Sequence, residues 1–224
     1  MTDQDQDSVA ERIARTLADR IVSGELPPGA PLRQDHVAAE FGTSHVPARE
    51  AFQQLRARGL AVSEPRRGMR VAPLDNASLR EVTEMRAALE ILALRHAAPR
   101  LTPEQIGRIE QAVAAGDEAR SIQDWEAANR TFHLELVAGC RMPRLLATLE
   151  ELRLANSRFT FAATRSAVWQ PRSNHDHRQI LEALRRGAID DAGALLGRHI
   201  RGLERTGGTK PSSSPQPPRG GRIS

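Results

Sequence analysis

The sequence predicts a mainly α-helical fold, in which a small N-terminal domain of three helices and a β-hairpin precedes a C-terminal all-helical bundle of about six helices. Only 3% of the 224 residues are aromatic and none is Tyr, so the chain is poor in the residues that populate sheets. Apolar residues instead recur at helical spacing along most of the chain. The length suffices for two small domains with separate cores. All-β folds are therefore disfavoured.

Three helices are predicted near the N-terminus. The first covers residues 8–22, where apolar residues recur every fourth position: Val9, Ile13, Leu17 and Ile21. A Pro-Pro-Gly turn at 26–29 follows, and a short second helix ends at Gly42. Ser44 is a favourable N-cap for a third helix that runs to about Arg58. A tight glycine turn thus joins the second and third helices.

The third helix has two distinct faces. One is apolar and is predicted to face the domain core; the other is polar and comprises His45, Arg49, Gln53 and Arg56. Two short strands are predicted next, at 60–63 and 69–71, with Arg66 and Arg67 at the tip of the hairpin between them. Three helices, a glycine turn and a basic hairpin together predict a winged helix-turn-helix.

Charge is unevenly distributed along the chain. Residues 33–70 contain seven Arg and four acidic residues, whereas residues 1–25 contain three Arg and six acidic residues. A basic winged helix-turn-helix predicts duplex DNA as the partner, with the third helix in the major groove and the wing on phosphates or in the minor groove. The alternative is an ordinary solvated charged face. The residues expected to contact DNA are Arg33, Ser44, His45, Arg49, Gln53, Arg66, Arg67 and Gly68.

The stretch GELPPGAPLRQDHVAAEFGTSHVPAREAFQQLRARGL, followed by PRRGMRV, resembles the signature of the GntR family of bacterial transcription regulators. The residues that match the family pattern are Gly24, Pro28, Gly29, Leu32, Ala38, Ser44, Pro47, Arg49, Glu50, Ala51 and Leu55. The sequence departs from this pattern at Gln34, His45 and Ala48. Where the family usually has Arg, a neutral His45 would make a shorter and weaker contact, so we expect the operator half-site to deviate there.

After a turn and helix N-cap at 75–78, the pattern has helical period only. Six helices are predicted, at roughly 78–98, 103–119, 122–139, 142–167, 173–186 and 189–205. We therefore expect a winged helix-turn-helix domain at 1–75, a helical domain at 76–205, and a disordered basic tail at 206–224, which is rich in Gly, Pro and Ser. The helical domain resembles the FCD ligand-binding domain of the FadR subfamily, which implies effector binding and dimerisation.

Histidines on apolar helix faces are a second notable feature: His133, His177 and His199. One such histidine is usually a satisfied core residue, but three on three helices of one bundle favour a metal site, because neutral imidazole is the commonest metal ligand. The FCD resemblance implies a divalent, zinc-type ion held by Asn129, His133, His177 and His199, with Asn129 where the family has Asp. An amide is a weaker, neutral ligand, so weak metal binding and a polar pocket without metal remain alternatives.

Arg86 lies in a series of residues that predicts one inward face of its helix. A buried Arg needs a partner, and Glu90, one turn later, is one candidate. The resemblance implies instead that Arg86 binds the carboxylate of a small organic acid. We hypothesise that this anionic effector completes the metal site. The residues expected to bind it are Arg86, Asn129, His133, His177 and His199.

These features predict a metabolite-responsive transcription regulator rather than an enzyme, binding palindromic operator DNA as a homodimer. The resemblance to the GntR family implies a repressor rather than an activator. The alternatives are a metal-dependent hydrolase that uses the histidine cluster, which lacks an HExxH motif and a recognisable general base, and a helical scaffold for protein partners. An acidic N-terminus, the absence of a long apolar run and a single Cys140 favour a cytoplasmic protein that does not insert into membranes.

Overall fold

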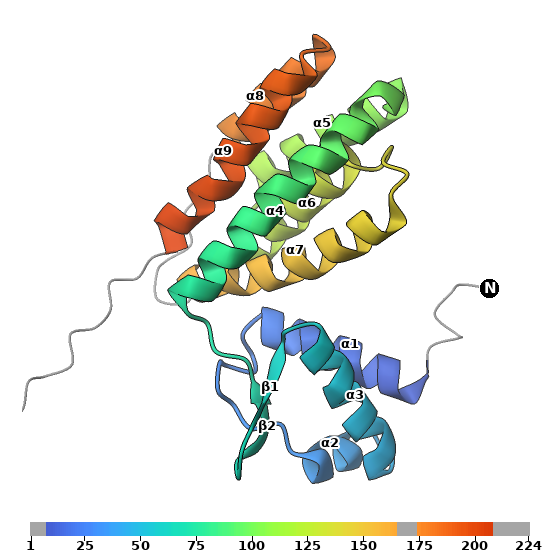
Figure 1. Cartoon of the computed structure of the whole chain (residues 1–224), viewed down its shortest axis with the longest axis vertical. Coiled ribbons are helices and arrows are strands. Elements are labelled where there is room, and N and C mark those ends of the chain that lie inside the picture. Colours follow the sequence, from blue (N-terminus) through green and yellow to red (C-terminus); the bar gives the residue numbers. More distant parts are fainter. Residues whose placement is uncertain (1–7, 165–173, 208–224) are drawn as a thin grey trace, which may run out of the picture.

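The computed structural model of the protein describes residues 8–164 and 174–207 (Figure 1). The elements are α1 (Val9–Val22), α2 (Gln34–Glu40), α3 (His45–Ala57), β1 (Ala61–Glu64), β2 (Gly68–Val71), α4 (Asn76–Ala97), α5 (Pro103–Glu118), α6 (Ile122–Leu136), α7 (Pro143–Thr164), α8 (His175–Arg185) and α9 (Ile189–Gly207). The predicted fold class is confirmed: a winged N-terminal unit is followed by a helical bundle. Within the described ranges, no helix is long and apolar enough to cross a membrane.

The N-terminal unit folds around one apolar core. Its first helix starts with a capping box, in which the Glu11 N–H donates to Ser8 Oγ and the Ser8 N–H donates to Glu11 Oε2. Gly42 has a φ of +59°, which permits the tight turn between α2 and α3. The core combines side chains from all three helices and the sheet: Ile13, Leu17, Leu32, Val37, Phe52, Leu55, Leu60 and Val71. Its packing orients the opposite face of α3 toward solvent.

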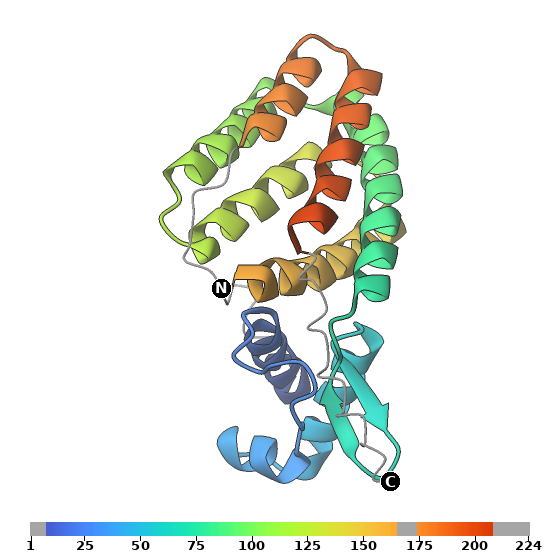
Figure 2. The ribbon, with the colours of Figure 1, turned by 90° about the vertical axis from the view of Figure 1, so that its left-hand side faces the viewer.

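The wing is the antiparallel hairpin of β1 and β2. At its tip the Arg67 N–H donates to the Glu64 carbonyl at 3.1 Å. Arg66 lies inside this turn with a φ of 64°, in the left-handed region that non-glycine residues rarely occupy. The wing tip and α2 lie at the end of the molecule away from the helical bundle, as Figure 2 shows.

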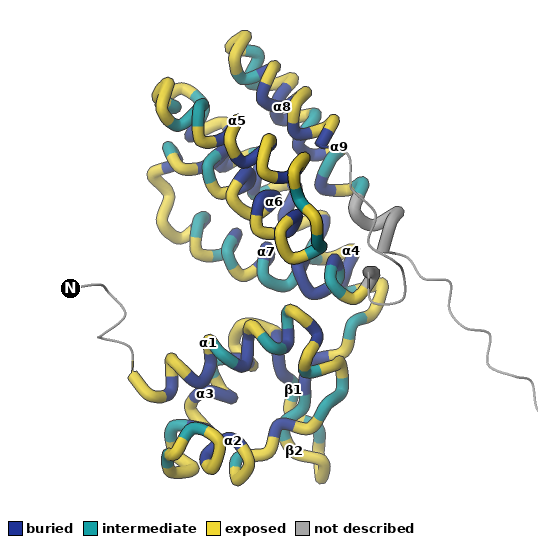
Figure 3. Tube along the Cα trace, turned by 180° about the vertical axis from the view of Figure 1, so that it is seen from behind, coloured by how far each residue is buried: buried dark blue, intermediate teal, exposed yellow. Residues whose placement is uncertain are grey.

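The helical unit has a second apolar core and an unusual polar interior. The core includes Leu94, Ile109, Phe132, Leu136, Leu149, Ile180, Leu196 and Ile200. Polar side chains are also buried, mainly on α4, α6 and α7: Thr83, Arg86, Glu90, Glu126, Asn129, His133, Arg153, Asn156, Ser157, Thr160 and His177. Figure 3 marks the buried stretches of these helices. Because buried polar groups need partners, this interior is where a ligand site is expected.

Some predicted helix boundaries are wrong. α4 begins at Asn76, two residues earlier than predicted, because Asp75 caps it by accepting a hydrogen bond from the Ser78 N–H at 2.8 Å. α6 ends at Leu136 rather than at 139, and a 3₁₀ helix at Ala98–Arg100 is not predicted. α9 continues to Gly207, so the predicted tail begins too early. The rest of that tail, 208–224, lies outside the described residues.

Candidate functional site

The residues expected to contact DNA lie on the outer face of α3 and its N-cap, at the N-cap of α2, and in the wing. Ala48, Ala51, Phe52 and Leu55 are buried, so the helix divides into the two predicted faces. All eight expected contact residues are exposed: Arg33, Ser44, His45, Arg49, Gln53, Arg66, Arg67 and Gly68. Ser44 occupies the N-cap position, but its side chain makes no capping hydrogen bond, which leaves its hydroxyl available to a phosphate. This face has the form of a helix that enters a groove.

Two ion pairs and one exposed apolar side chain near this face were not predicted. His45 Nδ1 lies 3.3 Å from Asp35 Oδ1, so an acidic residue of α2 orients the imidazole at the start of α3. Val46, in the first turn of α3, is 51% exposed. Its position beside His45, on a face of otherwise polar residues, was the available signal in the sequence. In the wing, Glu64 lies 3.7 Å from Arg67 and partly neutralises it.

The three predicted histidines come together inside the bundle from three helices. His133 lies on α6, His177 on α8 and His199 on α9, and their candidate ligand atoms all lie within 4.8 Å of one another. The Nε2 atoms of His177 and His199 are 3.0 Å apart. The ring of Phe132 stacks on His177 with 4.0 Å between centroids and holds that imidazole in place. The predicted cluster is thus formed, although distant segments of the chain supply it.

Carboxylates fix the orientation of two of these imidazoles. His133 Nδ1 lies 2.7 Å from Glu90 Oε2, and His199 Nδ1 lies 3.3 Å from Asp176 Oδ2. A carboxylate accepts hydrogen bonds, so each Nδ1 carries the proton and each Nε2 keeps its lone pair. His133 Nε2 and Asn129 Oδ1 are buried without a hydrogen-bond partner. In the contact between His177 Nε2 and His199 Nε2, His177 is then the donor, and its Nε2 offers a lone pair only in the other tautomer. Three neutral imidazoles and one amide oxygen fit the donor preference of a divalent, zinc-type ion.

Burial keeps the cluster neutral. It lowers the pKa of His133 to about 3, against the opposing effect of Glu90, and it also lowers the pKa values of His177 and His199. Neutral imidazole is the protonation state that binds metal. By contrast, His175, two residues before His177 on α8, is exposed.

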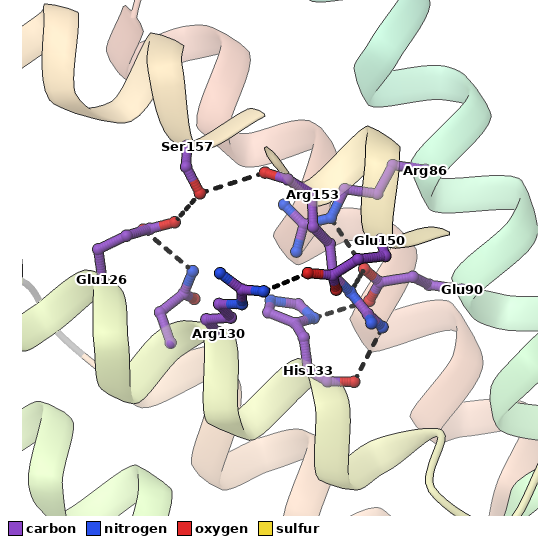
Figure 4. A network of polar contacts seen from close by, with 9 residues as sticks. Arg86, Glu90, Glu126, Arg130, His133, Glu150, Arg153 and Ser157 are labelled. Carbon is purple, nitrogen blue, oxygen red and sulfur yellow. Dashed lines mark hydrogen bonds and ion pairs between the residues drawn. The ribbon is translucent and has the colours of Figure 1, made fainter. Parts of the chain in front are cut away.

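Glu90 is the centre of a buried polar network beside the histidines (Figure 4). It accepts hydrogen bonds from Arg86 Nε at 2.8 Å and from Arg153 Nε at 3.1 Å, in addition to its contact with His133. Burial disfavours its charge, but His133, Arg86 and Arg153 outweigh this and hold the pKa of Glu90 well below its usual value. The structural alternative for Arg86, pairing with Glu90, is therefore observed.

Arg86 retains binding capacity despite this pairing. Among the described residues, none accepts a hydrogen bond from either of its Nη groups, although the side chain is only 3% exposed. Two other groups are buried without a partner: the hydroxyl of Thr83, on the same helix, and Asn156 Oδ1, on α7. Such unpartnered groups are rare in a protein interior unless a ligand or water satisfies them.

The polar face of α7 was missed by the sequence reasoning. Arg153, Asn156, Ser157 and Thr160 recur at helical spacing and are all buried. Ser157 donates to Glu126, which in turn accepts from Asn129 Nδ2 at 3.3 Å. A polar stripe at this spacing inside an otherwise apolar bundle was the signal that could have identified them.

Comparison with known families agrees with this architecture. Residues 9–71 match the family described as bacterial regulatory proteins, gntR family, and residues 81–202 match the FCD domain. The chain belongs to the GntR family. It is a transcriptional regulator of this family with a C-terminal FCD domain, as the sequence motifs indicated.

Relatives that this GntR-family protein matches over most of their length are also named as regulators. It is 33% identical over 198 residues to a probable D-xylose utilization operon transcriptional repressor of Paenarthrobacter nicotinovorans, with 86% of each chain covered. It is 27% identical, over the same shares of both chains, to the HTH-type transcriptional repressor RspR of Escherichia coli. A GntR structure from Rhodococcus sp. RHA1 shares the fold, with a TM-score of 0.75 at 22% identity over 90% of this chain and 98% of that chain.

Proposed function

We propose that this GntR-family regulator is a cytoplasmic repressor that binds palindromic operator DNA as a homodimer and responds to a small carboxylic acid. In this proposal, residues 1–75 bind DNA and residues 76–205 bind the effector and dimerise. Two relatives named as transcriptional repressors support the sign of regulation. The buried polar interior of the FCD domain supports control by a ligand.

The exposed face of α3 would lie in the major groove of the operator. Arg49 presents a guanidinium that can donate two hydrogen bonds to a guanine edge. Gln53 and His45 would contact neighbouring bases or phosphates, and Arg33 and the wing residues Arg66, Arg67 and Gly68 would contact the backbone or minor groove. Val46 adds exposed methyl groups that can contact the methyl of a thymine.

The histidine cluster would hold a divalent, zinc-type ion. His133, His177 and His199 would each contribute Nε2, and Asn129 would contribute Oδ1. Such an ion, when bound, supplies a Lewis-acidic centre that attracts a carboxylate. Because all four protein ligands are neutral, no protein charge at the ligand positions offsets the ion, and an anionic effector is favoured beside it.

Arg86 would anchor the carboxylate of the effector. Its Nε is held by Glu90, which also holds His133, so Arg86 shares a partner with the cluster while both of its Nη groups stay available. A guanidinium with both Nη groups available suits a carboxylate, which accepts two hydrogen bonds from it. The observation that carries the proposal is that Arg86, whose Nη groups have no acceptor among the described residues, shares Glu90 with His133 of the cluster.

Calorimetric titration and operator binding test the proposal together. Zinc-loaded protein is titrated with a panel of small mono- and dicarboxylates, with and without hydroxyl groups. The operator is selected from random duplexes with the wild-type protein. We expect one acid of the panel to bind and to lower operator affinity by about 5- to 150-fold, the range of typical allosteric coupling. Binding of no acid, or binding without effect on operator affinity, would contradict the proposal.

The hydrolase remains a weaker candidate. The carboxylates that contact the cluster, Glu90 and Asp176, each accept a hydrogen bond from a histidine Nδ1. Both are thus engaged in orienting imidazoles, and neither is placed as a general base. Turnover of esters or phosphoesters by the zinc-loaded protein would be required to favour this candidate.

A further inference from the structure

Helix α7 contacts both units of the molecule. It crosses between the other bundle helices and α1, as Figures 1 and 2 show. On one side its Leu154 packs against the N-terminal core, and on the other its polar stripe reaches the interior of the bundle. One rigid helix therefore touches the proposed effector site and the DNA-binding unit at once.

Arg153 attaches α7 to the proposed effector site. Its Nε donates to Glu90 Oε1 at 3.1 Å, and its Nη2 donates to the carbonyl of His133 at 3.0 Å. Glu90 also binds Arg86 and the His133 ring. A ligand that draws on Arg86 or His133 would thus change the groups that hold Arg153, and with it the position of α7.

Arg158, five residues later on the same helix, attaches α7 to the winged unit. Its Nη2 donates to the carbonyl of Ala72 at 2.7 Å, directly after β2. The Ala72 N–H donates to the Leu60 carbonyl at 2.9 Å, and the Leu60 N–H donates to Leu55 in the last turn of α3, also at 2.9 Å. Arg158 is therefore connected by a short series of hydrogen bonds to the helix proposed to read DNA.

The environment of Arg158 is costly for a side chain with only a structural role. The residue is 5% exposed, its Nε has no hydrogen-bond partner, and among the described residues no carboxylate pairs with it. Burial lowers the pKa of its guanidinium. A buried cation without a counterion is often less stable than an apolar side chain of similar volume. Stability alone therefore does not account for an arginine at this position.

We propose that Arg158 is a positioning residue that couples the effector site to the recognition helix through its hydrogen bond to Ala72. The inference rests on the proposed function, because it specifies how the effector changes DNA affinity. Movement of α7, set by the Arg153–Glu90 contact, changes the Arg158–Ala72 contact and thereby the placement of α3 and the wing.

The test compares full-length wild type with Arg158→Met, Arg158→Lys and Arg144→Gln. Met fills the same volume without charge, Lys retains one donor, and Arg144 is an exposed arginine of the same helix that serves as the matched control. The probe is the acid of the carboxylate panel with the largest effect on wild type. Operator affinity is measured with and without this acid by fluorescence anisotropy, acid affinity by calorimetry, and stability by thermal unfolding.

We expect Arg158→Met to bind the acid with wild-type affinity and to unfold at or above the wild-type temperature, while the acid changes its operator affinity less than about twofold. Arg158→Lys should retain part of the response and Arg144→Gln all of it. A wild-type response in a folded Arg158→Met protein would overturn the inference, and so would loss of thermal stability with the response intact, which indicates a structural role. If no acid of the panel affects wild type, the proposed function itself fails.

Discussion

At the scale of single residues, the polar interior is organised by two carboxylates that each orient a histidine. Glu90 holds His133, and Asp176 holds His199, so that Nε2 of each ring keeps its lone pair. Glu90 also binds Arg86 through Nε alone, which leaves the rest of the guanidinium for a ligand. Glu90 thus orients both the His133 ring and the guanidinium of Arg86.

Arg86→Met tests the proposed anchor. We expect carboxylate affinity of the zinc-loaded protein to fall about 10- to 100-fold, because a hydrogen bond to a charged group contributes roughly 1.5–3 kcal/mol. Zinc affinity should stay near that of wild type, since the side chain is not among the proposed ligands. Both are measured by calorimetry, with Arg80→Met, an exposed arginine of the same helix, as control. Unchanged acid affinity would exclude Arg86 as the anchor.

The depressed pKa values of the histidines predict how stability depends on pH. In metal-free protein the buried rings stay neutral as pH falls below 6.5, the usual pKa, whereas the same rings in the unfolded chain take up protons. The free energy of unfolding is therefore highest well above pH 6.5 and falls as the pH drops below that value. At pH 5.5 the loss is about 1.4 kcal/mol for each histidine that remains neutral in the folded protein. Glu90 adds a further loss only below about pH 4.5, since its pKa is lowered from that value.

Urea unfolding in the presence of a chelator, at pH 7.5 and pH 5.5, measures this loss. His177→Ala should lose less stability between the two pH values than wild type does. His175→Ala, which alters an exposed histidine of the same helix, should lose as much as wild type. An equal pH dependence in wild type and His177→Ala would show that the buried ring does not stay neutral.

Val46 yields a prediction for sequence recognition. If its methyl groups contact a thymine methyl, replacing that thymine by deoxyuridine should weaken wild-type binding about fourfold, as roughly 0.8 kcal/mol per buried carbon implies. In Val46→Ser protein the same replacement should have no effect. Anisotropy titrations with operators carrying deoxyuridine at each thymine in turn would measure both. Equal sensitivity of the two proteins at every position would contradict the contact.

At the scale of elements, α8 is attached to α5 by its N-terminal end. Asn174, the N-cap of α8, is buried and donates from Nδ2 to the Val113 carbonyl at 3.3 Å and to Asp117 Oδ1 at 3.0 Å. Gly116 makes room for this contact, because a Cβ there would lie 2.6 Å from Asn174 Nδ2. Since His177 follows Asn174 by three residues, this attachment positions one proposed metal ligand.

Gly116→Ala is therefore expected to displace the start of α8 and to lower zinc affinity about tenfold, the lower end of the effect of supporting residues on metal sites. Gly107→Ala is the matched control, because it lies in the same helix and a Cβ there would meet no atom within 4 Å. The control should raise stability by up to about 1 kcal/mol through helix propensity. Zinc titration and thermal unfolding distinguish the two. Equal zinc affinity in both variants would argue against this role of the attachment.

The order of elements and the residues on each helix face could be predicted from the sequence, because helical period depends on local spacing. The apolar face of α3 and the inward positions of His133 and His177 are examples. The pairing of Glu90 with Arg86 could be predicted from the sequence, but its other two partners could not, since His133 and Arg153 lie 43 and 63 positions away and are brought near only by packing. The early end of α6 was missed for a local reason, as no Gly or Pro marks residue 136.

At the scale of the whole molecule, α7 links the proposed effector-binding interior to the surface proposed to bind DNA. The interior collects buried polar groups from α4, α6, α7 and α8 together with the half-buried His199 of α9, while the exposed face of α3 and the wing lie at the opposite end. Effector control then requires only that the acid bind two arrangements of these units with different affinities, a difference of about 1–3 kcal/mol.

We propose that the buried histidines and Arg86 form one metal-dependent effector site. Its most direct test is the divalent metal content of purified untagged protein, dialysed without chelator, for wild type and His177→Ala by elemental analysis. We predict close to one ion per chain in wild type and its loss in the variant. Absence of metal from both proteins would contradict the metal site, and an equal metal content in both would show that the ion is held elsewhere.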